Sequence, residues 1–124
     1  MVLFANASSY GQQNELEFLV TSIEKDIIID GISNEKEWDK AEWQSEFWLW
    51  RPNDSVKADK QTRFKILKNE KNLYILIELF SDGTKFSTPS LKRDFSTFGA
   101  DAITLLFDTF SDGTNAFSFT TNPL

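Results

Sequence analysis

Two neighbouring segments in the middle of the chain have the hydrophobic patterns of paired strands. In residues 62–68, Phe64 and Ile66 alternate with charged residues, which predicts a strand with one dry face and one wet face. Residues 73–80 are apolar at nearly every position, which is typical of a central strand covered on both sides. The polar residues 69–72 lie between the two segments and predict a hairpin connection.

Further strands are expected on either side of this hairpin. Residues 18–32 are rich in β-branched and aliphatic side chains, which predicts two short strands or one bent strand. Residues 47–50 read as a strand that is apolar on both faces. Residues 102–107 and 116–121 predict the last two strands, joined through the Ser-Asp-Gly turn at residues 111–113.

One short helical segment is predicted at residues 34–41. Asn34 is suited to the N-cap, and Glu37 would stand at the third helical position. Trp38 and Ala41 lie three apart on one face, and we interpret them as the anchor that pins the segment to the core. Short strands with turn signals and almost no helix predict an all-β fold, an antiparallel β-sandwich.

Composition narrows the classes of function. The chain has 124 residues with 40% hydrophobic and 15% aromatic content, which suits a single domain with one core. The formal net charge of -6 argues against a nucleic-acid partner, which requires clustered Lys and Arg. The lack of His and Cys removes the usual general base, thiol chemistry and disulfides. No stretch approaches the roughly 20 apolar residues of a membrane span, so none is expected.

The N-terminus has the pattern of an export signal. Residues 1–4 are apolar, and residues 5–7 show the small-residue A-x-A pattern of a cleavage site before a polar run. We interpret residues 1–14 as a signal-peptide remnant with a polar linker, and residues 18–124 as the folded domain. The protein is then expected to be exported to the periplasm, the outer membrane or the extracellular space. The alternative is a disordered apolar N-terminus with no targeting role.

Three motifs, in order, resemble those of family 9 carbohydrate-binding modules. Residues 29–41 are similar to the opening "DG…E…W…A" of the family, residues 73–82 to its "LYV…D", and residues 98–108 to its "W..D.vE.f.D". The matching positions are Asp30, Gly31, Glu35, Trp38, Ala41, Leu73, Tyr74, Asp82, Phe98, Asp101 and Asp108. The resemblance implies a jelly-roll-like β-sandwich that binds carbohydrate without catalysis.

A closer likeness is to the family 9-like domain at the front of large bacterial outer-membrane proteins. Residues 93–94, 108–112 and 119–123 are similar to theirs. In the family, later strands complete the sandwich, so this chain is expected to be incomplete at its C-terminus and to be followed by further strands and a larger domain. Open edge strands beside Phe-rich faces predict that the chain aggregates.

The resemblance also implies a sugar site. Family members stack the sugar on the aromatic residue of the third motif, with a second Trp much later in the chain. They bond it with the Glu of that motif and with an Arg and an Asn on the following strand. The matching positions here are Phe98, Thr104, Thr120 and Asn122. Two neutral hydroxyls replace charged groups, so Phe98 and Asn122 remain the carbohydrate-binding candidates. For Phe98, packing of its loop is the alternative.

Two further aromatic residues are candidates for a stacking platform. Trp48 and Trp50 lie two apart, which places both on one face of a strand. Core packing is the alternative, because the adjacent Phe47 and Leu49 leave no clear wet face.

Acidic residues at strand ends suggest a structural Ca²⁺, which family 9 modules can bind. The metal candidates are Asp82, Asp101 and Asp108, and no other cofactor is expected. Ordinary turn formation by Asp is the alternative. A glycosidase would need two carboxylates that face each other across a cleft, and no such pair stands out, so the chain is not expected to be an enzyme.

The leading hypothesis is a carbohydrate-binding-like module of an exported protein, associated with a glycan-degrading system. The alternative is a structural or protein-interaction sandwich domain that has lost the sugar site, at the front of an outer-membrane protein.

Overall fold

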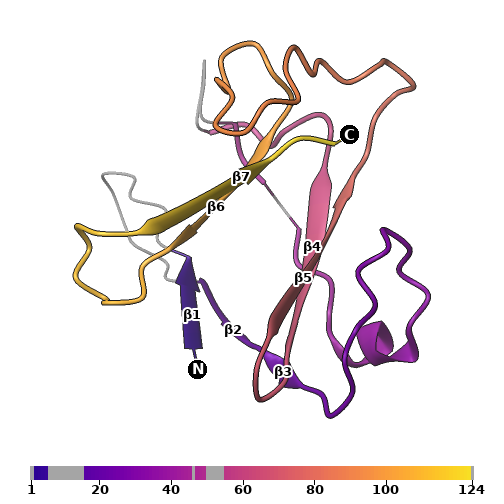
Figure 1. Cartoon of the computed structure of the whole chain (residues 1–124), viewed down its shortest axis with the longest axis vertical. Coiled ribbons are helices and arrows are strands. Elements are labelled where there is room, and N and C mark those ends of the chain that lie inside the picture. Colours follow the sequence, from indigo (N-terminus) through magenta and orange to yellow (C-terminus); the bar gives the residue numbers. More distant parts are fainter. Residues whose placement is uncertain (1, 6–15, 46, 50–54, 124) are drawn as a thin grey trace. The chain divides into compact units, whose positions relative to one another are not determined.

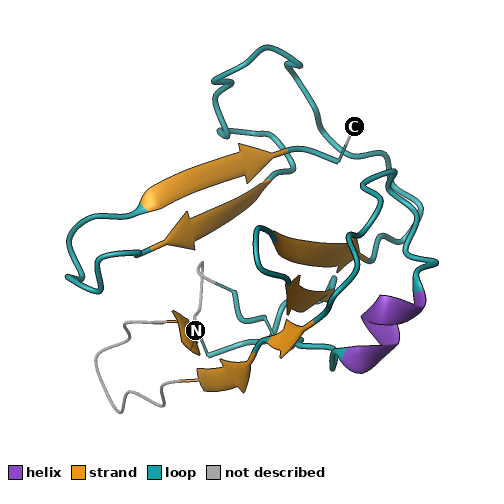
Figure 2. Cartoon of the chain, turned by 60° about the horizontal axis from the view of Figure 1, so that its bottom comes forward, coloured by secondary structure: helices purple, strands orange, loops and turns teal. Residues whose placement is uncertain are grey.

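The structure is a computed structural model, and it describes residues 2–5, 16–45, 47–49 and 55–123. These residues are mostly strands, loops and turns, with very little helix (Figure 2), which confirms the all-β prediction. In chain order the elements are β1 (Val2–Ala5), β2 (Leu16–Leu19), β3 (Thr21–Ser22), the 3-10 helix η1 (Lys36–Lys40), β4 (Thr62–Lys68), β5 (Leu73–Leu79), β6 (Ile103–Phe107) and β7 (Phe117–Thr121). No helix within the described part of the chain has the length and apolar character needed to cross a membrane.

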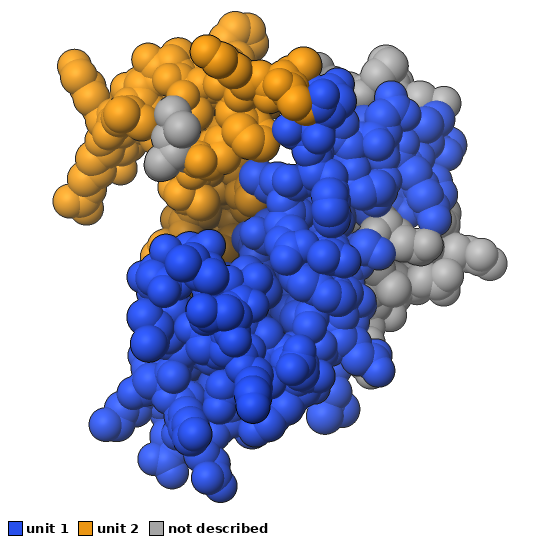
Figure 3. Space-filling view, turned by 90° about the vertical axis from the view of Figure 1, so that its right-hand side faces the viewer, with its two compact units in different colours: residues 1–82 blue, residues 83–124 orange. Residues whose placement is uncertain are grey.

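The chain divides into two compact units, residues 1–82 and residues 83–124 (Figure 3). The first unit contains β1 to β5 and η1, and the second contains the β6–β7 pair.

In the first unit, β4 and β5 form the predicted antiparallel hairpin (Figure 1). Phe64 lies opposite Ile77 in the register. The side-chain oxygen of Asn69 accepts hydrogen bonds from the backbone N–H groups of Lys71 (2.9 Å) and Asn72 (2.8 Å). This Asx turn reverses the chain, as the polar residues between the strands predict.

The strand order β3-β4-β5 places β5 at the edge of its sheet in the described structure, so the prediction of a central strand is wrong. The apolar run of β5 has another cause. Tyr74 and Leu76 face the core cluster, while Ile75 and Ile77 are half-buried on the other face. An apolar run indicates that both faces of a strand are covered by side chains. It does not indicate that both edges of the strand are paired with neighbouring strands.

Two chain segments extend the sheet beyond the other side of β4. Strand β3 runs parallel to the end of β4, with Thr21 opposite Leu67. Gln44 forms an isolated antiparallel bridge to Phe64, with both backbone hydrogen bonds at 2.8 Å. Strands β1 and β2 pair with each other antiparallel in a separate two-stranded sheet.

The prediction for residues 18–32 is met only at their beginning. The end of β2 and the whole of β3 are short strands, but residues 27–29 lie outside every strand that the structure describes. Ile27 is buried in the core, whereas Ile28 and Ile29 are exposed. The apolar run at residues 27–29 thus belongs to a segment outside the described strands, and only its first residue, Ile27, is packed in the core.

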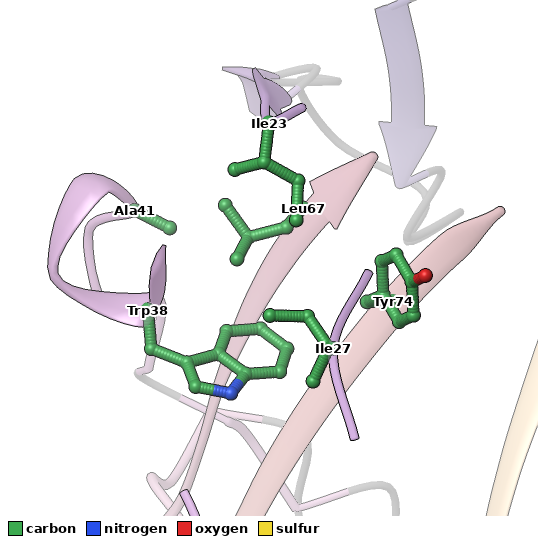
Figure 4. Close-up of a cluster of buried hydrophobic side chains, with 6 residues drawn as sticks. All are labelled: Ile23, Ile27, Trp38, Ala41, Leu67 and Tyr74. Carbon is green, nitrogen blue, oxygen red and sulfur yellow. The ribbon is translucent and has the colours of Figure 1, made fainter. Parts of the chain in front are cut away.

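The core of the first unit forms around the predicted helical segment. Helix η1 begins after Glu35, so the prediction of Asn34 as the N-cap is wrong. Trp38 from η1 and Ala41 just after it are both buried, which confirms that they anchor this segment. Figure 4 shows the Trp38 ring lying beside Leu67 of β4. The complete cluster contains Ile23, Ile27, Trp38, Ala41, Leu67 and Tyr74.

The predicted wet face of β4 is covered. Lys65 is only 8% exposed, and its ammonium donates a hydrogen bond of 2.7 Å to the carbonyl oxygen of Trp38. The same ammonium lies 4.7 Å from the centroid of the Trp43 ring. The prediction that this face is solvated is therefore wrong, because segments distant in the sequence supply a carbonyl and an aromatic ring for the buried charge.

A polar network lies at the rim of this core. The Tyr74 hydroxyl donates to Asp26 Oδ1 at 2.8 Å, and the Asn69 amide donates to the same oxygen at 2.7 Å. These bonds, the one from Tyr74 first, hold the pKa of Asp26 below its ordinary value. The network links the β4–β5 turn to the segment that follows β3.

The second unit contains the predicted C-terminal hairpin. Strands β6 and β7 pair antiparallel, with Leu105 opposite Phe119 and Phe107 opposite Phe117. The Phe107 and Phe119 rings meet edge to face at 5.7 Å between centroids. Because side chains alternate along a strand, these aromatic and aliphatic residues share one face of the hairpin, and Thr104, Ser118 and Thr120 lie on the other face together with Leu106.

Candidate functional site

Phe98 lies on a loop that internal hydrogen bonds hold in shape, and its side chain is 93% exposed. Ser87 exchanges two bonds with Asp101: its N–H donates to Asp101 Oδ2 at 2.7 Å, and its carbonyl oxygen accepts from the Asp101 N–H at 2.8 Å. The Ser87 hydroxyl donates to the Gly99 carbonyl oxygen at 2.8 Å, and the Phe98 N–H donates to Ser96 Oγ at 3.3 Å. A ring on a loop fixed in this way can stack a ligand at little cost in loop ordering.

The loop of Phe98 and the residue Asn122 belong to the same end of the β6–β7 hairpin. The register pairs Ile103 with Thr121, so β6 begins where β7 ends. The Asn122 amide donates a hydrogen bond of 3.3 Å to the carbonyl oxygen of Ser90, in the connection before β6. The two sugar-binding candidates of the second unit are thus brought to one rim.

Thr104 and Thr120 are directly opposite each other, and their hydroxyl oxygens are 2.9 Å apart. Both side chains are exposed. Asn122 comes directly after the last residue of β7 and is half-buried. The Thr104 and Thr120 hydroxyls and the Asn122 amide thus come from the end of the hairpin at which β6 begins and β7 ends.

The three metal candidates have other partners. Asp101 Oδ2 is bonded to the Ser87 N–H, and Asp108 accepts the N–H groups of Phe110 (3.1 Å) and Gly113 (2.9 Å). Asp101 and Asp108 lie beyond opposite ends of β6. Asp82, in the first unit, forms an ion pair of 3.2 Å with Lys60. Within the described ranges, no group of three or more acidic residues is placed to share a metal ion.

The turn between β6 and β7 uses a further carboxylate. Asp112 accepts hydrogen bonds from the Asn115 amide and from the backbone N–H groups of Thr114 and Asn115, at 2.8, 2.9 and 2.8 Å. These donors, the Asn115 amide first, hold the pKa of Asp112 well below its usual range. Turn formation accounts for this acidic residue.

Trp48 is 55% exposed, which removes core packing as its explanation. It forms an isolated antiparallel bridge with Lys57, whose ammonium lies 5.8 Å from the centroid of the Trp48 ring. Bonds of 2.9 Å from the Leu49 N–H to the Val56 carbonyl oxygen and from the Ala58 N–H to the Phe47 carbonyl oxygen flank this bridge. Trp50 lies outside the described residues. Of the predicted strand at residues 47–50, the structure describes residues 47–49, where Trp48 forms an isolated bridge and no strand.

Sequence reasoning missed a cluster of charged and aromatic side chains around Arg63. The Arg63 guanidinium lies 4.1 Å from the centroid of the Trp43 ring and 5.2 Å from that of Phe80. Its Nη2 and Nε bond the same oxygen of Glu78, at 2.6 and 2.7 Å. The signal was present, because a tight turn at residues 69–72 places Arg63 opposite Glu78.

A hollow of about 370 Å³ opens beside this arginine. Its lining residues are Ser45, Lys57, Gln61, Thr62, Arg63 and Phe80. Hydroxyl, amide and cationic groups thus surround one aromatic ring, the combination by which proteins hold polar ring-shaped ligands.

Comparison of the chain with protein-family models, with curated proteins and with solved structures gave no match. The strands and their pairing place the chain in the all-β class, with an antiparallel hairpin in each of the two units.

Proposed function

We propose that this chain is a non-catalytic carbohydrate-binding module of an exported protein, with a jelly-roll-like β-sandwich architecture similar to that of family 9 modules. The observation that carries the proposal is the 93% exposure of Phe98 on a loop fixed by hydrogen bonds. A large aromatic ring held in water in this way is suited to stack on the C–H face of a pyranose.

The polar groups at the same end of the hairpin fit a neutral sugar. Asn122 supplies an amide, and Thr104 and Thr120 supply hydroxyls that can donate or accept. Neutral hydrogen bonds are weaker than charge-assisted ones, so we expect modest affinity. The apolar face of the hairpin, which carries Leu105 and Phe119, supports the sandwich, because such sheets keep one apolar face for the core.

The second candidate function is a structural or interaction domain that has lost the sugar site. The observation that favours it is the 2.9 Å contact between Thr104 and Thr120, since each hydroxyl already has the other as a partner. In either case, we propose that the protein acts outside the cytoplasm, in glycan capture or at the outer membrane.

Calorimetry of the full chain with a panel of mono- and oligosaccharides tests the proposal. We expect binding to the wild type and a loss of about tenfold or more in Phe98→Ala, the size of one removed stacking contact. Phe110→Ala is the matched control, because Phe110 is also exposed and lies at the opposite end of β6. If the wild-type chain gave no heat with any sugar while its circular dichroism spectrum showed a folded β protein, the result would favour the interaction domain and overturn the carbohydrate proposal.

A further inference from the structure

A second hollow, of about 470 Å³, opens in the first unit and shares no lining residue with the hollow beside Arg63. Its volume lies within the range of roughly 300–1,000 Å³ that is typical of sites for small molecules. All of its lining residues belong to the first unit. They are Leu19, Thr21, Lys40, Ala41, Glu42, Gln44 and Ile66.

Hydrogen bonds fix the segments that form the walls of this hollow. Gln44 exchanges two backbone bonds of 2.8 Å with Phe64 of β4. Thr21 of β3 lies opposite Leu67 in the register, and its hydroxyl donates to the carbonyl oxygen of Lys40, the last residue of η1, at 3.3 Å. Strands and a helix end that are tied together in this way need little ordering when a ligand binds.

Three side chains of the lining carry polar groups that the protein does not use for its own contacts. Among the described residues, no hydrogen bond or ion pair engages the Lys40 ammonium, the Glu42 carboxylate or the Gln44 amide. Lys40 and Glu42 are exposed, and Gln44 is half-buried. An ammonium donates, a carboxylate accepts and an amide does both, so a molecule in the hollow meets donors and acceptors.

The charges of the described lining residues balance, because the Lys40 ammonium offsets the Glu42 carboxylate. A ligand with one charge is attracted by one of these groups and repelled by the other. A neutral molecule with several hydroxyls uses both, since a hydroxyl donates to a carboxylate and accepts from an ammonium. Such charge-assisted bonds are roughly twice as strong as bonds between neutral groups.

The lining also contains an apolar part. Ala41 and Ile66 are each 8% exposed, and both line the hollow. A pyranose has C–H groups on its faces and hydroxyls around its rim. A hollow with a few apolar groups and several convergent polar ones therefore suits a sugar ring.

We propose that this hollow binds one unit of a neutral sugar, with its hydroxyls bonded to Lys40, Glu42 and Gln44 and its C–H groups against Ala41 and Ile66. The contact lies in the first unit and is separate from the site at Phe98 in the second. The ligand is a glycan, as in the proposed function, on which the inference rests in that respect alone.

The test is calorimetry of the full chain with Phe98→Ala, which removes the stacking contact of the other site. The ligands are the methyl glycosides of glucose, galactose, mannose and xylose. We expect at least one of them to bind. Adding Glu42→Gln or Lys40→Met should weaken it by about tenfold or more, the size of a lost charge-assisted bond.

Glu24→Gln and Lys36→Met are the matched controls. They remove the same charges from exposed residues that do not line the hollow, and Lys36 lies on η1 as Lys40 does. We expect both control variants to bind as tightly as the Phe98→Ala chain. Equal weakening by the controls would show a general effect of charge and overturn the inference.

A comparison of two ligands separates contact with the sugar from a structural effect of the substitutions. The neutral glycoside should bind more tightly than the uronate of the same sugar, because the lining is balanced in charge. Glu42→Gln leaves Lys40 as the charged group of the lining, so the ratio of the two affinities should shift toward the uronate. An unchanged ratio would overturn the inference.

The remaining outcomes separate the inference from the proposed function. Loss of all sugar binding in Phe98→Ala would overturn the inference and leave the site at Phe98 standing. Sugar binding that Glu42→Gln weakens and Phe98→Ala leaves unchanged would support the inference and remove the site at Phe98. Tighter binding of alanine, a zwitterion, than of any sugar would also overturn the inference. A wild-type chain that binds no sugar overturns both.

Discussion

The ammonium of Lys65 donates a hydrogen bond of 2.7 Å to the backbone carbonyl oxygen of Trp38, which joins β4 to η1 inside the core. The carbonyl belongs to the middle residue of a five-residue 3-10 helix. The Ala41 N–H also donates to this oxygen, at 3.3 Å, and a side chain from a distant strand supplies the second hydrogen bond that a carbonyl oxygen can accept. A buried lysine therefore adds a charge-assisted hydrogen bond to a carbonyl oxygen that already accepts the Ala41 N–H.

Replacement of this lysine should destabilise the first unit. Lys65→Met keeps the length of the side chain but removes the charge-assisted hydrogen bond to the Trp38 carbonyl and the contact of the ammonium with the Trp43 ring, so we expect the free energy of unfolding to fall by about 1–3 kcal/mol. Urea denaturation followed by tryptophan fluorescence measures the change. Lys85→Met, at an exposed lysine, should differ from the wild type by less than about 0.5 kcal/mol. Equal stability of the Lys65→Met and Lys85→Met proteins would contradict this account.

The core around Trp38 gives a second prediction. Leu67 is 0% exposed and lies in the cluster with Trp38 and Ile23. Leu67→Ala removes buried apolar atoms and leaves a cavity, so we expect a loss of about 2–5 kcal/mol. Leu79→Ala, at the exposed end of β5, should cost less than half as much. Thermal or urea unfolding of both variants provides the comparison, and similar losses would place the core elsewhere.

The network at Asp26 predicts a dependence of stability on pH. Tyr74 and Asn69 lower the pKa of Asp26 in the folded state below the unfolded value of about 3.9. The stabilisation is therefore present above the unfolded pKa and is lost as the pH falls through the folded pKa. Tyr74→Phe removes the largest cause, so we expect a flatter loss of stability with acidification below about pH 5.

Unfolding midpoints measured between about pH 6 and pH 2 would show this effect, because Asp residues titrate within that range. Asp112 contributes in the same direction in all variants, because its pKa is also lowered. If the effect arises from the bond between Tyr74 and Asp26, Asp26→Asn should flatten the profile as well. The double variant should then be no flatter than Asp26→Asn. Additive effects would show that Tyr74 acts through another group.

The local elements could be predicted from the sequence because their signals lie within a few residues. The alternation at Phe64 and Ile66, the polar turn beginning at Asn69 and the position of Trp38 each describe a short segment. The structure confirms the β4–β5 hairpin, the helical turn and the β6–β7 hairpin. Their strands and turns follow from side-chain alternation and Asx chemistry, which are local properties.

Features that depend on distant partners could not be predicted. Lys65 reads as a solvent-facing residue until Trp38 and Trp43, more than twenty residues earlier, are known to cover it. The place of β5 at a sheet edge likewise depends on which strands find each other. Hydrophobic periodicity gives the burial of a face and does not identify what buries it.

The residues of the candidate sites show the same difference between local sequence signals and contacts with distant residues. Family likeness pointed to Phe98 and Asn122, and the register of the β6–β7 hairpin brings their segments to one end. The cluster around Arg63 was missed because it depends on Trp43, which carried no motif. Exposure of Trp48 could not be decided from the apolar residues beside it.

The open edge of β5 gives a last prediction. In the sheets that the described residues form, β5 is paired on one side, by β4, and its sequence contains one charged residue, Glu78. Long apolar edges pair with other chains, and an edge lysine opposes this. Leu79→Lys should therefore raise the concentration at which oligomers appear in light scattering. Leu91→Lys adds the same charge at an exposed loop position, so an equal gain in that variant would attribute the effect to net charge and not to the strand edge.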